Sequence, residues 1–235
     1  MPNQRKCRNF EDWIDIINSI IRTGELYSKV NNLVSLGLAD KLREIGVKYI
    51  IGVNILDAGS GPGDSTAKIL LSISRSYVIC LDASFILSLR CITKLKELSN
   101  RFDIVVGLFE NPPIRVSSID SIYSSYSIRD SINLLKAVYM LSRLIRKGGC
   151  FIDIDIGKPD NPVIQLLLKL YIKYAVPIIS SIHTGSAKNP WVKLADTITR
   201  IPENKILFKI FSKIFRTTYL YSLFKGSLIM IVACK

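Results

Sequence analysis

The sequence has few of the residues that build metal sites and disulfide frameworks. It contains one histidine and five cysteines among its 235 residues. No two cysteines form a Cys-x-x-Cys pair and their number is odd, so we expect neither a zinc site nor a disulfide framework. No apolar run follows the basic first eight residues, so we expect no signal peptide and a cytoplasmic protein.

Long apolar runs without charged residues are also lacking. A transmembrane helix needs about 18 or more apolar residues with few charges. The longest uncharged stretch, Tyr174 to Ala187, is shorter, and Pro177 and Gly185 interrupt it. We therefore expect no membrane span, although the mean hydropathy of +0.29 is high for a soluble protein.

Acidic residues are scarce relative to basic ones. The chain carries 32 Lys+Arg against 19 Asp+Glu, a formal net charge of +13. This excess indicates an anionic partner, which could be nucleic acid, a lipid surface or a phosphorylated substrate. Because 49% of the residues are hydrophobic and 22% are charged, the chain can bury a sizeable core, which excludes intrinsic disorder.

Short β-branched runs alternate with segments of helical periodicity from residue 50 onward. This alternation is typical of β-α-β units that form a parallel sheet covered by helices on both faces. Before residue 50 the spacing is helical, with a second helix predicted over Tyr27 to Ile45. Predicted strands cover residues 53–57, 77–82, 103–107, 119–125, 150–156, 217–223 and 226–233. Further helices are predicted over residues 65–74, 84–98, 131–145, 161–182 and 203–215.

The sharpest motif is a glycine loop that follows the first predicted strand and opens a helix. Gly59, Gly61 and Gly63 allow a sharp turn and a close approach to a ligand. A dinucleotide fingerprint requires glycine where Asp64 stands, and a P-loop requires a Gly-Lys-Ser/Thr that is missing. Asp57 precedes the loop instead, and an acid there would repel a pyrophosphate but suits a positively charged amino group.

A second acid, Asp82, ends the next predicted strand, about 20 residues beyond the loop, where an acid commonly accepts hydrogen bonds from ribose hydroxyls. A carboxylate near the loop together with a ribose acid describes a site for an aminoacyl nucleoside without phosphates. S-adenosylmethionine is such a ligand. The alternative is a structural turn beside an ordinary surface aspartate.

Four further segments carry a resemblance to a known family. They are Tyr27–Leu38, Ser125–Asp130, Arg143–Pro159 and Leu194–Glu203. These segments are similar to signatures of the ubiquinone/menaquinone biosynthesis C-methyltransferase family, within the class I S-adenosylmethionine-dependent methyltransferases. The resemblance covers most of the chain.

The resemblance implies an α/β, Rossmann-like class I methyltransferase fold. Its sheet would have seven strands, mostly parallel with an antiparallel last strand, and helices on both faces. The chain would then divide into a helical cap over residues 1–48 and a cofactor-binding core over 49–158. A helical substrate lid over 159–200 and a helix with a strand pair over 201–235 would complete it.

The same resemblance implies S-adenosylmethionine as the cofactor and no metal. Leu108 and Phe109 stand where the family has an Asp/Asn-Ala pair, so adenine would be held by backbone groups and apolar packing. Ser127 replaces a family glycine, and Asp155 replaces a glutamate. The implied cofactor contacts are Asp57, Gly59, Gly61, Gly63, Thr66, Asp82, Leu108, Phe109 and Ser125.

Three residues are candidates for the methyl-transfer chemistry. A cation beside a hydroxyl lowers the pKa of that hydroxyl and stabilises the phenolate, and we assign this role to Arg129 as a hypothesis. Tyr27 would orient the ring or the cofactor, and Asp155 would line the substrate mouth. The alternatives are an ion pair of Arg129 with Asp130 or Asp155, and a core position for Tyr27.

The sequence therefore predicts a C-methyltransferase that acts on a lipophilic quinone or quinol precursor. Lysines among Ile, Leu and Phe in the C-terminal third suit peripheral contact with an anionic membrane, on its inner face. Nucleic acid is the less favoured partner, because no RNA-binding module is visible. Methylation of RNA or of another phenol or lipid, cofactor binding without catalysis, and a homodimer stay open.

Overall fold

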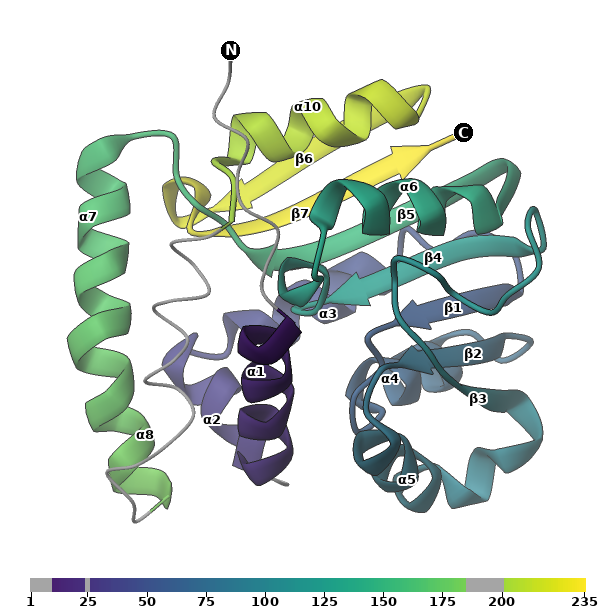
Figure 1. The fold of residues 1–235 in the computed structure, drawn as a ribbon, viewed down its shortest axis with the longest axis horizontal. Helices are drawn as coiled ribbons and strands as arrows, with labels where there is room; N and C mark the ends of the chain where they lie inside the picture. The colour runs from purple at the N-terminus through teal and green to yellow at the C-terminus, as the bar shows by residue number, and fades with distance from the viewer. Residues whose placement is uncertain (1–9, 24–25, 185–200) are drawn as a thin grey trace.

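The computed structural model describes residues 10–23, 26–184 and 201–235 and contains a seven-stranded sheet flanked by helices (Figure 1). The strands lie in the order β3-β2-β1-β4-β5-β7-β6. Strand β7 is antiparallel to both neighbours, and the other neighbouring strands pair in parallel, which confirms the predicted Rossmann-like sheet. The strands are β1 (Asn54–Ala58), β2 (Tyr77–Asp82), β3 (Phe102–Val106), β4 (Ile119–Ser125), β5 (Ile145–Ile156), β6 (Thr217–Leu223) and β7 (Leu228–Cys234).

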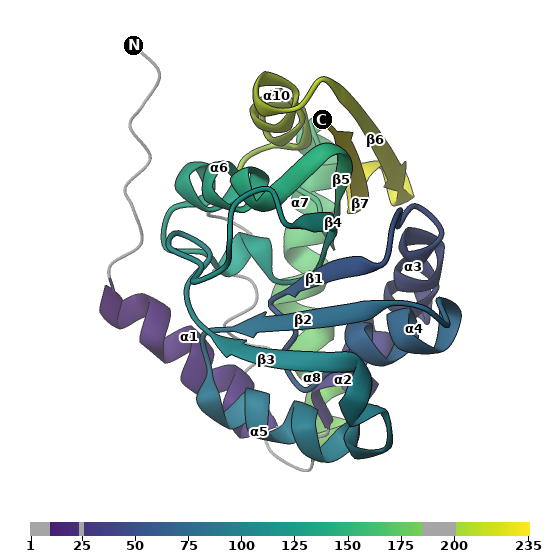
Figure 2. The same cartoon turned by 90° about the vertical axis from the view of Figure 1, so that its right-hand side faces the viewer.

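Two apolar layers cover the opposite faces of the sheet. Residues of α3, α4 and α5 form one layer, and residues of α6 and α10 form the other. Figure 2 shows α3 and α4 on one side of the strands and α6 and α10 on the other. The α-helices are α1 (Phe10–Thr23), α2 (Leu26–Val34), α3 (Leu38–Val47), α4 (Asp64–Ser72), α5 (Phe85–Lys94), α6 (Leu134–Leu144), α7 (Pro162–Leu170), α8 (Val176–Thr184) and α10 (Asn204–Ile214). Short helical turns are η1 (Lys96–Arg101), η2 (Ile128–Asp130), η3 (Tyr171–Ala175) and η5 (Phe224–Gly226).

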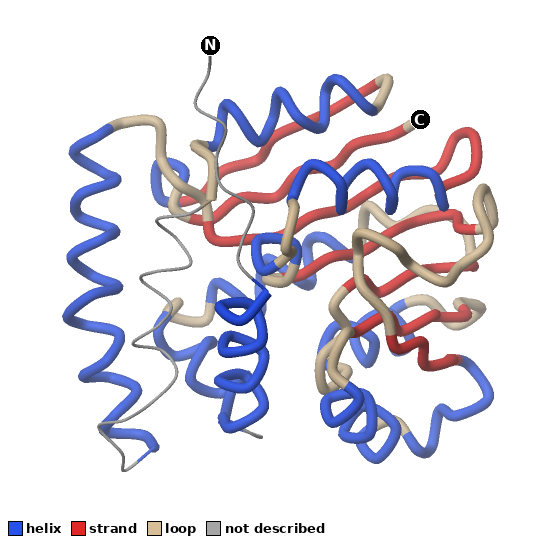
Figure 3. The backbone as a smooth tube through the Cα atoms, in the orientation of Figure 1, coloured by secondary structure: helices blue, strands red, loops and turns tan. Residues whose placement is uncertain are grey.

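Side-chain alternation along β5 decides which residues reach which layer. Successive side chains of a strand point to opposite faces. Ile152 and Ile154 pack in the layer of α3 and α4, whereas Phe151 packs in the other layer, on Phe211 of α10. Asp153 and Asp155 therefore project from the same face as Phe151, toward the carboxyl end of the strand. In Figure 3 the strands, drawn in red, run side by side between the blue helices.

The single helix predicted over Tyr27 to Ile45 is wrong, because the chain breaks there into α2 and α3. Leu36 and Gly37 have φ values of 53° and 79°, in the left-handed region that ends a helix. The Gly37 amide donates to the Asn32 carbonyl, which satisfies one of the last carbonyls of α2. The break lets α3 lie along the sheet while α2 turns away toward α8.

Asp120, near the start of β4, ties the amino end of β1 to the neighbouring strand. Its side chain is 1% exposed, and Oδ2 accepts hydrogen bonds from the amides of Val53 (2.8 Å) and Asn54 (3.0 Å). The other oxygen lies 2.6 Å from Nε of Arg146. Gly52 has a φ of 75°, and a Cβ there would lie 2.3 Å from Oδ2 of Asp120, so a larger residue would displace the carboxylate.

The sequence analysis expected no disulfide framework, and the described residues contain one disulfide. Cys150 on β5 and Cys234 on β7 are register partners with their Cα atoms 4.1 Å apart, and their sulfurs are bonded. They are 84 residues apart in sequence, so only the pairing of the strands reveals the bond. Cys80 and Cys91 are buried free thiols, and Cys7 lies outside the described residues.

The predicted helix over residues 161–182 is confirmed as α7, the π-turn η3 and α8, which stand beside α2 (Figure 1). The π-turn precedes Pro177, which lacks the N–H that a regular helix requires. By length and composition, Pro162–Ile182 could cross a membrane, and 17% of its apolar 18-residue window is buried. The sequence analysis did not recognise this helix as long and apolar enough, because Lys169 and Lys173 interrupt its uncharged run. Core helices of soluble proteins can have the same length and composition, so these two properties do not show that the helix crosses a membrane.

We predict that Asp120→Ala lowers the free energy of unfolding by about 2–3 kcal/mol, because two backbone donors lose a charged acceptor. Urea denaturation measures the change. Arg146→Ala is the control: its side chain is 54% exposed, so its loss should cost less than about 1 kcal/mol. Equal losses for the two variants would show that the backbone hydrogen bonds of Asp120 do not tie β1 to β4.

Candidate functional site

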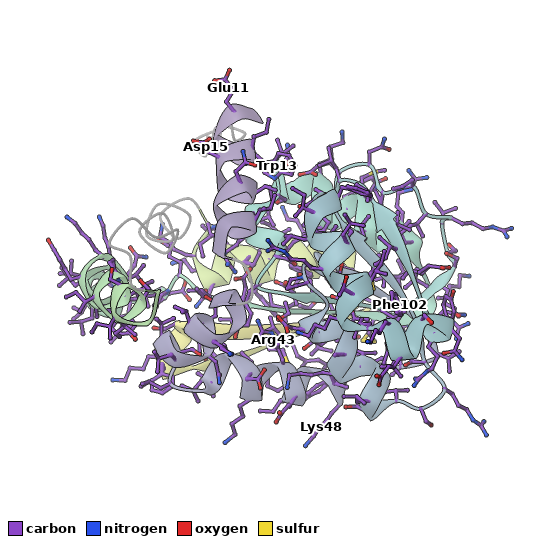
Figure 4. All side chains as sticks on the ribbon, turned by 90° about the horizontal axis from the view of Figure 1, so that it is seen from below. Glu11, Trp13, Asp15, Arg43, Lys48 and Phe102 are labelled. Atoms are coloured by element: carbon purple, nitrogen blue, oxygen red, sulfur yellow. A yellow bond between two sulfur atoms is a disulfide. The ribbon has the colours of Figure 1, made fainter. Side chains whose placement is uncertain are left out.

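A cleft lies at the carboxyl ends of the central strands, where open α/β sheets bind ligands. Its empty space, including the part open to solvent, is about 830 Å³. The glycine loop and the ends of β2, β3 and β4 form its walls, and Trp13 and Ile17 of α1 close one side. Figure 4 labels Trp13 and Arg43, which come to the cleft from α1 and α3.

The glycine loop supplies the wall after β1. Gly59 and Gly61 line the cleft, and the Gly61 amide donates to Oδ2 of Asp82 at 2.8 Å. A Cβ on Gly59 would lie 2.3 Å from Cβ of Ser127, so only glycine lets the end of β4 approach the loop this closely. Gly63 lies behind the loop, at the start of α4, where a Cβ would lie 2.7 Å from Sγ of Cys91.

Asp57 and Thr66 lie beneath the loop and do not line the cleft. The Thr66 hydroxyl donates to Oδ2 of Asp57 at 2.6 Å, whereas Oδ1 of this fully buried carboxyl has no hydrogen-bond partner. Burial raises the pKa of Asp57 to about 7, against the opposing effects of Thr66 and Arg43. The unsatisfied oxygen indicates a donor or cation that the protein itself does not supply.

Asp82 ends β2 and lines the cleft. Its oxygens accept one backbone amide each, from Gly61 and from Ser84, both at 2.8 Å. Each oxygen keeps a second acceptor position, since a carboxylate has about four in all. Burial raises the pKa of Asp82, while the Ser84 and Gly61 amides oppose the rise. Leu108 and Phe109, which follow the next strand, β3, line the same cleft.

The end of β4 brings Ser125 to the cleft together with Arg43, which the sequence analysis missed. Nε of Arg43 donates to Oγ of Ser125 at 2.9 Å, and the guanidinium lies 4.9 Å from the centre of the Tyr126 ring. Arg43 is only 5% exposed. Tyr126 has a φ of 57°, a strained conformation for a bulky residue, and such strain clusters at functional sites. The spacing in the sequence could have indicated Arg43, because it follows Ala39 by four residues and therefore lies on the same face of α3, which is buried.

Arg129, the proposed catalytic cation, lies in the turn η2 after β4. It is 9% exposed and forms an ion pair with Asp155 of β5, and its Nε lies 3.8 Å from Asp130. Burial raises the pKa of Asp155, and the Arg129 charge opposes the rise. Arg129 and Asp155 do not line the cleft, although Asp130 and Ser131 beside them do. Tyr27 belongs to α2, and its side chain lies outside what the structure describes.

Curated relatives are similar in sequence to this chain over most of its length. A ubiquinone/menaquinone biosynthesis C-methyltransferase from Syntrophotalea carbinolica is 24% identical over 184 residues, 77% of each chain. A demethylmenaquinone methyltransferase from Lactococcus lactis is 27% identical over 205 residues, 85% of this chain and 79% of the relative.

Solved structures share the fold. A putative S-adenosyl-L-methionine-dependent methyltransferase from Methanococcus maripaludis matches with a TM-score of 0.58 and 18% identity, over 100% of this chain and 96% of the other. The ubiE/COQ5 methyltransferase family matches residues 9–235, nearly the whole length. The chain also has the glycine loop, the acid Asp82 at the end of β2 and the antiparallel strand β7. It belongs to the ubiE/COQ5 methyltransferase family.

Proposed function

We propose that this enzyme transfers a methyl group from S-adenosylmethionine to a ring carbon of a quinol precursor. One observation carries the cofactor assignment: binding groups follow one another along the carboxyl ends of four adjacent strands. An apolar pair follows β3, an acid ends β2, a glycine loop follows β1, and Ser125 with Arg43 lies at the end of β4. The names of the relatives support a quinone-type acceptor.

This order of groups suits the parts of S-adenosylmethionine. Leu108 and Phe109 would pack on the adenine, and Asp82 would accept hydrogen bonds from the ribose hydroxyls with its two remaining acceptor positions. The Arg43 guanidinium, which also lies 3.6 Å from Oδ1 of Asp40, would bind the carboxylate of the aminoacyl end with its remaining donors. Asp57 lies beneath the glycine loop rather than in the cleft, so its carboxylate would favour an ammonium group through its charge and not through a direct contact.

When bound, the cofactor supplies an electrophilic methyl group on a sulfonium. The protein must then align the acceptor and exclude water. Because Arg129 does not line the cleft, it would stabilise the phenolate that makes the ring carbon nucleophilic through an intervening water. The paired Asp155 would hold the guanidinium in one orientation, because both groups are buried beside η2.

The apolar helix from α7 to α8 supports the proposal of a peripheral membrane site on the inner face. Val163, Leu167 and Ile178 are 62%, 57% and 61% exposed, and their spacing puts them on one side of the helix. Lys169 and Lys173 are exposed on the same segment. An amphipathic helix of this composition binds a lipid surface through apolar insertion and attraction to anionic headgroups. A lipid surface would also be the source of an isoprenoid substrate.

We predict that Asp82→Ala weakens S-adenosylmethionine binding about tenfold to a hundredfold, because two hydrogen bonds to an ionised group are lost. Isothermal titration calorimetry measures the dissociation constant. Glu97→Ala, which removes an exposed acid on η1, should leave binding unchanged. Equal binding by both variants would remove Asp82 from the cofactor site.

Methyl transfer itself tests the proposed function. With methyl-labelled S-adenosylmethionine, we expect label in a demethylated menaquinol or ubiquinol precursor and none in total RNA. Arg129→Lys should lower turnover at least tenfold and keep the cofactor dissociation constant within about twofold, because lysine cannot reproduce the planar fork of arginine. Arg143→Lys, at an exposed position, is the control. Label in RNA alone would reject the quinol acceptor, and full turnover by Arg129→Lys would reject the role of Arg129.

Vesicle flotation tests the membrane proposal. We expect binding to vesicles that contain phosphatidylglycerol and little binding to phosphatidylcholine alone. Replacing Val163, Leu167 and Ile178 together with serine should abolish flotation. The matched control replaces three exposed apolar residues elsewhere, Leu71, Leu135 and Tyr139, and should float as the unaltered protein does. Flotation that survives the first replacement would show that this helix is not the lipid-binding surface.

A further inference from the structure

Ser127, at the end of β4, connects the glycine loop to the cleft through its hydroxyl. It lines the cleft, and its Oγ donates to the Ala58 carbonyl at 2.7 Å. Oγ of Ser124 lies 3.0 Å from Oγ of Ser127. The bare α-carbon of Gly59 makes this approach sterically allowed, because a Cβ there would lie 2.5 Å from Oγ of Ser127.

The direction of these hydrogen bonds follows from counting protons. A serine hydroxyl has one hydrogen and two acceptor positions. A carbonyl cannot donate, so the only hydrogen of Ser127 belongs to the bond with Ala58. Ser124 must therefore donate to Ser127. One acceptor position remains on Ser127, and toward the cleft this hydroxyl can accept a hydrogen bond but cannot donate one.

Asp153 is the other acceptor beside the Ser124 hydroxyl. It is the register partner of Ser124 on the neighbouring strand β5, and it is fully buried. An ionised Asp153 would compete for the Ser124 hydrogen. Burial, together with the nearby Asp155 charge, raises the pKa of Asp153 well above its usual value, which disfavours the ionised form, while a hydrogen bond with Ser124 opposes the rise.

The place of Ser127 in the cleft indicates which ligand group meets it. Ser125 and Ser127 lie two residues apart at the end of β4, and both line the cleft. Arg43, bonded to Ser125, offers only donors and selects an anion. Ser127 offers only an acceptor and selects a donor. A ligand end that carries an anion and a donor close together is an amino acid, with its carboxylate and its ammonium group.

We propose that Ser127 binds the ammonium group of the cofactor's aminoacyl end, as an acceptor whose polarity is set by the Ala58 carbonyl and Ser124. This inference rests on the proposed function, since it takes S-adenosylmethionine as the ligand. It adds a specificity-determining side chain at a position where the resembling family has glycine. The Ser127 hydroxyl thus gives this site a hydrogen-bond acceptor that a glycine side chain at the same position does not provide.

Two thioether ligands test the role of Ser127. S-adenosylhomocysteine carries the amino group, and its deamino analogue replaces that group with hydrogen and keeps the carboxylate, ribose and adenine. We expect Ser127→Ala to weaken S-adenosylhomocysteine binding about tenfold and to change binding of the deamino analogue less than twofold. Ser127→Gly should give the same pattern. Calorimetric titration of each protein with each ligand measures the four dissociation constants.

The matched comparison is Ser125→Ala, which disturbs Arg43 at the carboxylate end. It should weaken both ligands equally, since both carry the carboxylate. Equal weakening of both ligands by Ser127→Ala and Ser127→Gly, or unchanged binding of both, would overturn the proposed role of Ser127. Failure of the unaltered protein to bind S-adenosylhomocysteine at all would instead reject the cofactor and, with it, the proposed function.

Discussion

The close approach of the β4 end to the glycine loop is the contact on which the site depends. Ser127 lies against the bare α-carbon of Gly59, and its hydroxyl bonds the Ala58 carbonyl at the end of β1. The strand order of the sheet reverses between β1 and β4, and a crevice opens at such a point. Because residue 59 is glycine, the ends of β1 and β4 contact each other at the base of the crevice. Any Cβ there would push the two strand ends apart.

Several buried charged groups lie near this crevice, whereas Asp120 lies at the opposite end of the sheet. Arg129 pairs with Asp155, and the buried Asp153 lies on the same face of β5. Taking such groups out of water costs several kcal/mol per ion, and a buried ion pair is weak evidence for stability. Apolar residues would pack the same space at lower cost. The arrangement is therefore better explained by chemistry at the strand ends than by folding, and it connects the end of β5 to the acceptor side of the proposed site.

Part of the positive charge and of the high mean hydropathy lies on one element. The α7 to α8 helix keeps most of its apolar side chains exposed, with Lys169 and Lys173 among them. It packs on α2 through a small separate cluster of Val30, Ile172 and Val176, outside the two layers of the sheet. An apolar surface of this kind on a basic protein suits an anionic lipid partner better than nucleic acid, which would call for polar and basic groups without exposed leucines.

The sequence by itself determined the elements whose signal is local. Runs of β-branched residues predicted β2, β4 and β6 with the bounds that the structure has, and the spacing of glycines and acids predicted the loop and the two acids, Asp57 and Asp82. Tertiary structure alone decided the contacts between distant segments. It brought Arg43 to Ser125, joined Cys150 to Cys234 across 84 residues, and turned Arg129 inward to Asp155. Composition and spacing carry no information on such pairings, because they arise only when packed strands and helices put remote side chains within bonding distance.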